Sequence, residues 1–211
     1  MNLMVIDGYL GSGKTLGMSI LARYFQERSG CSLYSNYGLI GAQQFNHYSQ
    51  FLDLTNNQSS IVCLDEAHVD LDSRNSTTNI SKYFTHLMFY FRKLRTTMFL
   101  ATPSVENLDS RVRALANIYT HVEKKATKFN YHMWDLQSGR FLKTLSIPKS
   151  KAFAIAPQIY DTYKMVSPMI FPEKKEEFTK FISELKELND TYYLAEGEER
   201  RTAPTFEATS A

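Results

Sequence analysis

Residues 8–15 of this 211-residue chain read GYLGSGKT and directly follow the short apolar run NLMVID at 2–7. The spacing is a glycine, four residues, and then glycine, lysine and threonine. This pattern cradles nucleotide phosphates when it lies between a buried strand and a helix. From Lys14 to about Arg28, apolar residues recur at helical spacing, and Ser29 and Gly30 end the run. We therefore expect residues 8–15 to form a phosphate-binding loop (P-loop) between a strand and a helix.

Each residue type in this loop suits a nucleoside triphosphate with its metal ion. Glycines let the backbone curl so that successive N–H groups point at phosphate oxygens, and the N-terminus of the next helix adds partial positive charge. Lys14 is expected to reach the β- and γ-phosphates, and the Thr15 hydroxyl to ligate Mg²⁺. The predicted cofactors are thus ATP and Mg²⁺. The predicted nucleotide-binding residues are Gly8, Gly11, Ser12, Gly13, Lys14 and Thr15.

The second half of a nucleotide site is an acidic residue after a neighbouring strand, and SIVCLDE at residues 60–66 supplies one after its apolar run. Asp65 is expected to hold Mg²⁺ together with Thr15. Glu66 stands one residue further, where a carboxylate can orient and deprotonate the water that attacks the γ-phosphate. A simple nucleotide kinase has less use for this glutamate, because its acceptor is not water. Glu66 and Lys14 are therefore the predicted catalytic residues, and hydrolysis is favoured over transfer to a small molecule.

The tetrapeptide DEAH at 65–68 also invites comparison with helicases of that signature. Those helicases need two RecA-like domains, and 211 residues are too few for both. We therefore interpret His68 as incidental to the chemistry.

The rest of the chain alternates strand and helix patterns, which predicts an α/β fold with a mainly parallel central sheet flanked by helices. An alternating hairpin pattern at 128–135 and 140–147 follows, and then a helix at about 172–190. Further predicted strands are 31–35, 60–66, 96–101 and 117–123; predicted helices are 42–51 and 80–94, and 72–79 is a predicted loop. We expect a single P-loop ATPase domain over 1–194, with its core at about 1–125, the hairpin and last helix at 126–194, and a flexible tail at 195–211.

Composition and cysteine spacing give no sign of a strongly basic, a metal-binding, a secreted or a membrane-spanning protein. The formal net charge is +2, so any polyanion-binding surface must be local. Cys31 and Cys63 have no metal-ligand spacing and are expected to be reduced core residues. No signal peptide is evident, and no apolar run of about 18 residues predicts a transmembrane segment.

Two further sets of residues are candidates for sensing and assisting hydrolysis. Thr102 lies at the end of the strand in TTMFLATPS and could sense the γ-phosphate, with Ser104 as a second candidate. A simple strand-ending turn before Pro103 explains Thr102 equally well. A ring-forming ATPase also needs an arginine that reaches the γ-phosphate of its neighbour. The candidates for this trans arginine are Arg92, Arg95, Arg111 and Arg113.

With these motifs placed, the chain resembles the FtsK–HerA branch of P-loop ATPases. It is similar in pattern to the ATPase domain of the zonular occludens toxin family of phage proteins. In core and size it is also similar to the genome-packaging ATPases of internal-membrane icosahedral viruses. The resemblance covers about residues 1–165. It rests on IDGYLGSGKTLG (6–17), YSNYGL (34–39), IVCLDEAH (61–68), FRKLRTTMFLAT (91–102), NLDSRVRALAN (107–117) and IYDTYK (159–164).

The resemblance implies a RecA-like P-loop NTPase that works as a ring-shaped homo-oligomer on double-stranded DNA. Two departures bear on this expectation. The family usually ends its sensor strand with glutamine, where this chain has Thr102 and Pro103, and filamentous-phage assembly members carry a transmembrane helix that this chain lacks.

The second departure favours a packaging ATPase that drives double-stranded DNA into a capsid and contacts a capsid or portal-vertex protein. The expected location is the host cytoplasm, or the packaging vertex of the virion. The alternative is a phage assembly or extrusion ATPase of the zonular occludens toxin type, which would act with a separate membrane partner.

Overall fold

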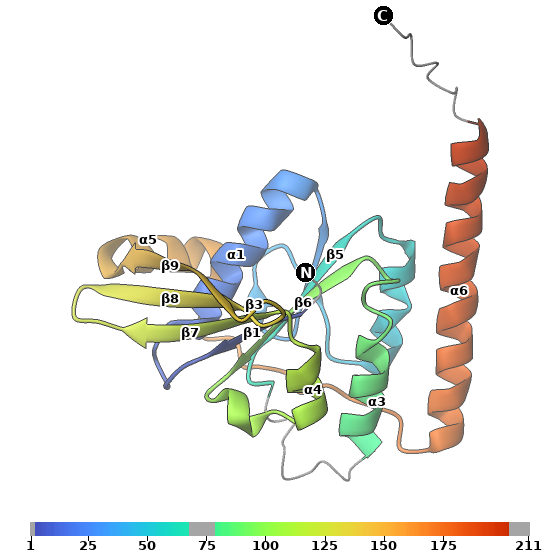
Figure 1. The fold of residues 1–211 in the computed structure, drawn as a ribbon, viewed down its shortest axis with the longest axis horizontal. Coiled ribbons are helices and arrows are strands. Elements are labelled where there is room, and N and C mark those ends of the chain that lie inside the picture. The colour runs from blue at the N-terminus through green and yellow to red at the C-terminus, as the bar shows by residue number, and fades with distance from the viewer. Residues whose placement is uncertain (1–2, 68–78, 203–211) are drawn as a thin grey trace, which may run out of the picture.

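The computed structural model describes residues 3–67 and 79–202, which fold around one mixed sheet (Figure 1). Its eight strands stand in the order β4-β2-β5-β6-β1-β7-β8-β9. They are β1 (Leu3–Asp7), β2 (Ser32–Ser35), β4 (Gln43–Gln44), β5 (Ser60–Leu64), β6 (Thr96–Thr102), β7 (Ile118–Lys124), β8 (Lys128–Asp135) and β9 (Arg140–Pro148). A second, two-stranded sheet pairs β3 (Gly38–Leu39) with β10 (Tyr160–Asp161).

The strands from β4 to β7 are parallel, and β8 and β9 add to them as an antiparallel hairpin. The predicted α/β fold with a mainly parallel sheet is confirmed, and the predicted hairpin extends that same sheet. Strand β6 lies between β1 and β5, so the carboxyl ends of β1 and β5 reach the same edge with one strand between them.

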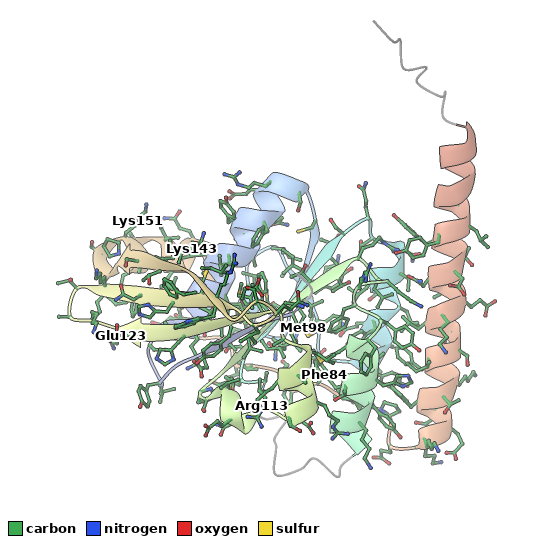
Figure 2. All side chains as sticks on the ribbon, viewed as in Figure 1. Phe84, Met98, Arg113, Glu123, Lys143 and Lys151 are labelled. Carbon is green, nitrogen blue, oxygen red and sulfur yellow. The ribbon has the colours of Figure 1, made fainter. Side chains whose placement is uncertain are left out.

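Helices cover both faces of the sheet, with α1 and α5 on one side and α3 and α4 on the other (Figure 1). The helices are α1 (Lys14–Ser29), α3 (Asn79–Met88), α4 (Ser110–Leu115), α5 (Lys149–Ile159) and α6 (Lys175–Thr202), with 3₁₀ turns η1 (Tyr48–Phe51), η2 (Asp53–Asn56) and η4 (Val105–Asn107). Each face has its own apolar cluster. In Figure 2, Phe84 of α3 and Met98 of β6 lie in the first of these clusters, whereas Glu123 and Lys143 lie at the far end of the molecule around β7–β9.

The predicted helix at 42–51 is wrong. Gln43–Gln44 instead forms β4 at the edge of the sheet, and only Tyr48–Phe51 makes a 3₁₀ turn. Phe45 and Phe51 are fully buried and in contact, with ring centroids 5.0 Å apart. Their burial against β2 outweighs the weak helix propensity of the residues between them.

The helix predicted at 80–94 ends at Met88. Residues 89–95 continue as successive turns that still bury Phe91 and Leu94 in the same apolar cluster, and Arg95 closes them with a φ of 54°. The apolar spacing thus predicts burial correctly here, but not the length of the helix.

The C-terminal part of the chain also differs from expectation. Helix α5 was not predicted, and α6 runs through Thr202, so residues 195–202 of the predicted flexible tail are helical. Most residues of this stretch are of types with high helix propensity, which explains how a segment with few apolar residues continues the helix. His68 and the predicted loop from 72 to 78 lie outside the described residues. Among the described helices, none is long and apolar enough to cross a membrane.

Helix α1 packs unusually close to β8. A Cβ atom added at Gly17 would lie 2.1 Å from the ring of Tyr131, and the Tyr131 hydroxyl donates a hydrogen bond of 2.9 Å to the carbonyl of Gly13. Burial raises the pKa of Tyr131, so this hydroxyl stays a neutral donor. The hairpin therefore supports the first turn of α1 directly.

Arg95 joins three segments at the other end of the sheet. Its guanidinium donates to the carbonyls of Thr55 (2.6 Å) and Asn57 (3.0 Å) and stacks over the Tyr192 ring of α6 at 3.6 Å. The Tyr193 hydroxyl adds a 2.8 Å hydrogen bond to the carbonyl of Lys93. These contacts hold the long helix α6 against η2 and the turn before β6.

We predict that Gly17→Ala lowers the free energy of unfolding by about 1–3 kcal/mol, because the new methyl group overlaps the Tyr131 ring. Urea denaturation measures the change. The same substitution in a Tyr131→Leu background should cost less, and an equal cost in both backgrounds would show that the ring is not the cause.

We predict that Arg95→Ala destabilises the protein by about 1.5–3 kcal/mol, because two partly buried carbonyls lose a charged donor and Tyr192 loses its cation. Arg92→Ala is the matched control, since Arg92 is exposed and should change stability by less than about 0.5 kcal/mol. Equal effects in thermal denaturation would contradict the structural role of Arg95.

Candidate active site

Residues 8–13 form a tight loop between β1 and α1. Gly8, Gly11 and Gly13 have φ values of 147°, 69° and 98°, in a region that L-residues with side chains rarely adopt. Lys14 is buried, and its ammonium donates to the carbonyls of Gly8 (2.9 Å) and Tyr9 (3.2 Å) of the same loop. The loop therefore folds around the Lys14 side chain at the start of α1.

The acidic strand end meets this loop directly. The Thr15 hydroxyl donates a 2.6 Å hydrogen bond to Oδ2 of Asp65, across fifty residues of sequence. Asn36 fixes the backbone of Asp65 from the other side: its Oδ1 accepts from the Asp65 N–H at 2.8 Å, and its Nδ2 donates to the Asp65 carbonyl at 3.0 Å. Asp65 is thus clamped between β2 and α1.

Glu66 lies at a sharp change of chain direction just after β5. Its φ is 51°, which is uncommon for a residue with a side chain, and its N–H donates to Oδ1 of Asp65 at 3.0 Å. The next N–H, of Ala67, donates to Ala101 of β6. This kink directs Glu66 to the cavity that the P-loop lines, rather than along the strand.

Burial raises the pKa of Asp65, because the carboxylate loses water; the hydrogen bonds from Thr15 and Glu66 oppose this effect. A buried carboxylate beside a hydroxyl is a fitting donor set for Mg²⁺, which typically takes one or two carboxylates and completes its shell with substrate phosphates and water. Within the described residues, no group of three or more His, Cys, Asp or Glu side chains could hold a metal alone. Thr15 and Asp65 would therefore hold the ion together with the nucleotide.

A cavity of about 290 Å³ opens beside the loop. Near it, the buried Ser12 hydroxyl has no hydrogen-bond partner among the described residues, so a polar ligand at the loop would satisfy it. The residues that line the cavity are Leu10, Gly11, Gly13, Lys14, Thr15, Leu16, Glu66, Phe129, Phe153, Ala156, Tyr160 and Thr162. Its size, its backbone donors and its lysine fit a nucleoside triphosphate.

Sequence reasoning missed several residues of this site. Asn36 falls within the quoted YSNYGL, but only the fold brings it to Asp65. The aromatic side of the cavity, Phe129, Phe153 and Tyr160, comes from β8, α5 and β10, which lie far along the chain from the loop. No local signal marks such residues, because their role depends on the hairpin returning to α1.

Thr102 ends β6, between the P-loop strand and the strand of Asp65, so it lies at the edge where a sensor would stand. It is fully buried, and its hydroxyl donates to the carbonyl of Ser104 at 3.0 Å, as expected for a strand-ending turn. The sensor role of Thr102 stays a prediction.

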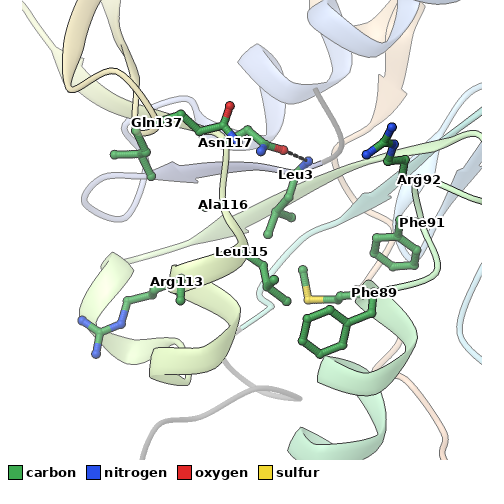
Figure 3. Close-up of a pocket in the computed structure, with 12 residues that line it drawn as sticks. Leu3, Phe89, Phe91, Arg92, Arg113, Leu115, Ala116, Asn117 and Gln137 are labelled. Atoms are coloured by element: carbon green, nitrogen blue, oxygen red, sulfur yellow. Dashed lines mark hydrogen bonds between the residues drawn. The ribbon is translucent and has the colours of Figure 1, made fainter.

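The four candidate arginines lie in different settings. Arg111 forms an ion pair with Asp109 at 2.6 Å, and Arg95 is bound by carbonyls of its own chain. Arg92 and Arg113 are exposed and line a larger cavity of about 630 Å³ that includes Leu3, the first residue of β1 (Figure 3). This cavity therefore lies at the opposite end of β1 from the P-loop, and any action of these arginines in trans stays a prediction.

Comparisons with known proteins agree with this geometry. Residues 4–125, more than half of the chain, match the ATPase family associated with various cellular activities (AAA). No curated protein matches the chain in sequence.

Solved structures share the fold, as the sequence resemblance implied. The N-terminal domain of zonular occludens toxin from Neisseria meningitidis has a TM-score of 0.56 and 18% identity over 76% of this chain and 98% of that domain. The genome packaging NTPase B204 from Sulfolobus turreted icosahedral virus 2, in complex with ATP-gammaS, has a TM-score of 0.50 and 13% identity over 68% of this chain and 96% of that one.

The loop at 8–15, the acidic pair at the end of β5 and the match over residues 4–125 lead to one conclusion. This chain belongs to the AAA family of P-loop ATPases and is an ATP hydrolase.

Proposed function

We propose that this ATPase is a viral genome-packaging motor that hydrolyses ATP to move double-stranded DNA into a capsid. The observation that carries the proposal is the contact of Asp65 with Thr15, with Glu66 lining the same cavity, in a fold shared with B204, itself a genome packaging NTPase. The match covers 96% of the B204 chain, so the shared fold extends over nearly all of that protein.

Within this proposal, each residue of the site has a separate task. The loop N–H groups and Lys14 bind the phosphates, and Thr15 with Asp65 holds Mg²⁺, which would neutralise charge on the phosphates. Glu66 accepts the proton of the attacking water, because its carboxylate lines the same cavity as Lys14. The buried position of Asp65 keeps it in place for the metal and away from this proton transfer.

The proposal includes a ring of identical subunits, with double-stranded DNA and a capsid or portal-vertex protein as partners. The exposed Arg92 and Arg113 are the arginines free to approach a neighbouring subunit, since Arg95 and Arg111 are engaged in their own chain. Such an arginine can raise hydrolysis by about 10³–10⁵ when it reaches the γ-phosphate of the next subunit.

A second candidate is an assembly or extrusion ATPase that acts with a membrane partner. It is supported by the similarity to the zonular occludens toxin domain, whose TM-score of 0.56 and identity of 18% exceed the corresponding values for B204. Both candidates use the same hydrolytic site and differ in the partner that receives the work.

We predict that Glu66→Gln binds ATP with nearly unchanged affinity but loses turnover by a factor of about 10² or more, because the proton acceptor is removed. Lys14→Ala instead should weaken ATP binding itself, because a phosphate ligand is lost. Nucleotide titration and a phosphate-release assay separate the two effects. Glu27→Gln, on the exposed side of α1, is the matched control, and near-normal turnover in Glu66→Gln would remove Glu66 from the role of base.

We predict that double-stranded DNA stimulates ATP hydrolysis and that the protein displaces a third strand from a triplex-tagged duplex only while ATP is hydrolysed. Glu66→Gln serves as the inactive control in the same assay. Hydrolysis that is indifferent to DNA, with phosphate appearing on a small molecule, would contradict a motor and support a kinase.

A further inference from the structure

The strands β7, β8 and β9 leave one face of the sheet open. Tyr119, Trp134 and Phe141 are cross-strand neighbours on this face, with ring centroids 5.6 Å apart for the first pair and 5.4 Å for the second. Phe141 is 54% exposed, and Tyr119 and Trp134 are half-buried. We call these three side chains the aromatic row.

The opposite face of the same strands is closed. There Val122, Phe129 and Tyr131 are buried in the cluster that packs under α1 and α5. Because side chains alternate along a strand, the aromatic row faces the side of α3 and α4, which cover the neighbouring part of the sheet and stop short of β8 and β9 (Figure 1).

The cavity of Figure 3 adjoins the aromatic row on this side. One wall includes Asn117, Leu136 and Gln137, and the N–H of Leu136 donates to the carbonyl of Asn117 at 2.9 Å. This contact lies two residues along each strand from the pair Tyr119–Trp134. Arg92 and Arg113 both line the cavity, and the Arg113 side chain extends from α4 away from Leu115 and Phe89. We call it the arginine cavity.

The two arginines of this surface are not held in ion pairs with other described residues. Within the described part of the chain, neither Arg92 nor Arg113 has a carboxylate within ion-pair distance. Of the acids near the aromatic row, Glu123 pairs with Lys125, whereas Asp135 stays a charged carboxylate that accepts from the N–H groups of Gln137 and Ser138. Two arginines without an ion-pair partner among the described residues therefore line the cavity beside the aromatic row.

We propose that this surface binds single-stranded nucleic acid, with phosphates at Arg92 and Arg113 and bases stacked on Trp134 and Phe141. A cationic groove next to exposed aromatic rings is how proteins hold single strands without reading sequence. A duplex fits poorly, because its bases are already stacked and cannot meet the rings. The proposal does not depend on the packaging function, since binding needs neither hydrolysis nor a ring. It assigns Arg92 and Arg113 to phosphates of the bound strand instead of to the γ-phosphate of a neighbouring subunit.

The surface is joined to the nucleotide loop. The Tyr119 hydroxyl donates to Oδ1 of Asp7 at 2.9 Å, and Asp7 immediately precedes Gly8. Oδ2 of Asp7 accepts from the N–H of Val105, in the turn that follows Thr102. A strand stacked on the aromatic row would therefore contact a residue that is one hydrogen bond from the start of the P-loop.

Trp134 is the only tryptophan of the chain, so tryptophan fluorescence reports this surface alone. We expect a twelve-residue oligothymidylate, or the matching oligouridylate, to quench this fluorescence in the full-length protein, while a blunt duplex of equal length does not. An oligonucleotide that binds in fluorescence anisotropy without changing Trp134 emission would overturn the proposal, and so would a duplex that quenches as strongly.

Substitutions separate stacking from charge. Phe141→Ala should weaken oligonucleotide binding at least about fivefold, whereas Tyr24→Ala, an exposed aromatic on α1, should not. The double variant Arg92→Ala/Arg113→Ala should reduce the slope of log affinity against log salt by about 1.4, with Arg28→Ala on α1 as control. An unchanged affinity in Phe141→Ala would overturn the proposal. So would sedimentation showing that the unsubstituted protein is a dimer that does not bind the oligonucleotide and that Phe141→Ala separates this dimer.

Discussion

The hydrogen bond from Thr15 to Asp65 is the contact on which the candidate active site depends. It joins the first turn of α1 to the end of β5, two segments that the chain separates by fifty residues. The bond is possible because β6 pairs with both β1 and β5, so that three parallel strands end at one edge. Asn36 holds the backbone of Asp65 from the other side, which leaves Glu66 as the carboxylate of this pair that faces the cavity.

The hairpin β8–β9 has two faces with different consequences. One face supports the P-loop, since Tyr131 holds the Gly13 carbonyl and leaves no room for a side chain at Gly17. The other face carries the aromatic row, and Tyr119 connects it to Asp7 at the end of β1. The pairing of β7 with β1 thus connects the open surface of β7–β9 to the strand that leads into the P-loop, which gives binding at one a short physical route to the other.

The sequence predicts the parts of this protein that local patterns encode. The parallel strands and the hairpin have spacings with a physical cause, and the structure contains both. It also places residues 8–13 between β1 and α1 and the acidic pair after β5, while the roles of these residues with ATP and Mg²⁺ stay predictions. Contacts between distant segments were not predicted. Arg95 was a candidate for action in trans, but it is bound to Thr55, Asn57 and Tyr192, none of which its local sequence reveals. The segment 42–51 was predicted as a helix because apolar spacing alone does not distinguish a helix from turns that bury Phe45 and Phe51.

The central claim is that Lys14, Thr15, Asp65 and Glu66 form one ATP-hydrolysing centre. A crystal structure with Mg²⁺ and a slowly hydrolysed ATP analogue tests it most directly. The account predicts that the Lys14 ammonium leaves the carbonyls of Gly8 and Tyr9 for the phosphates, while Thr15 and Asp65 share the metal ion. An analogue bound elsewhere, or a Lys14 that stays on its own loop with nucleotide present, would contradict the account.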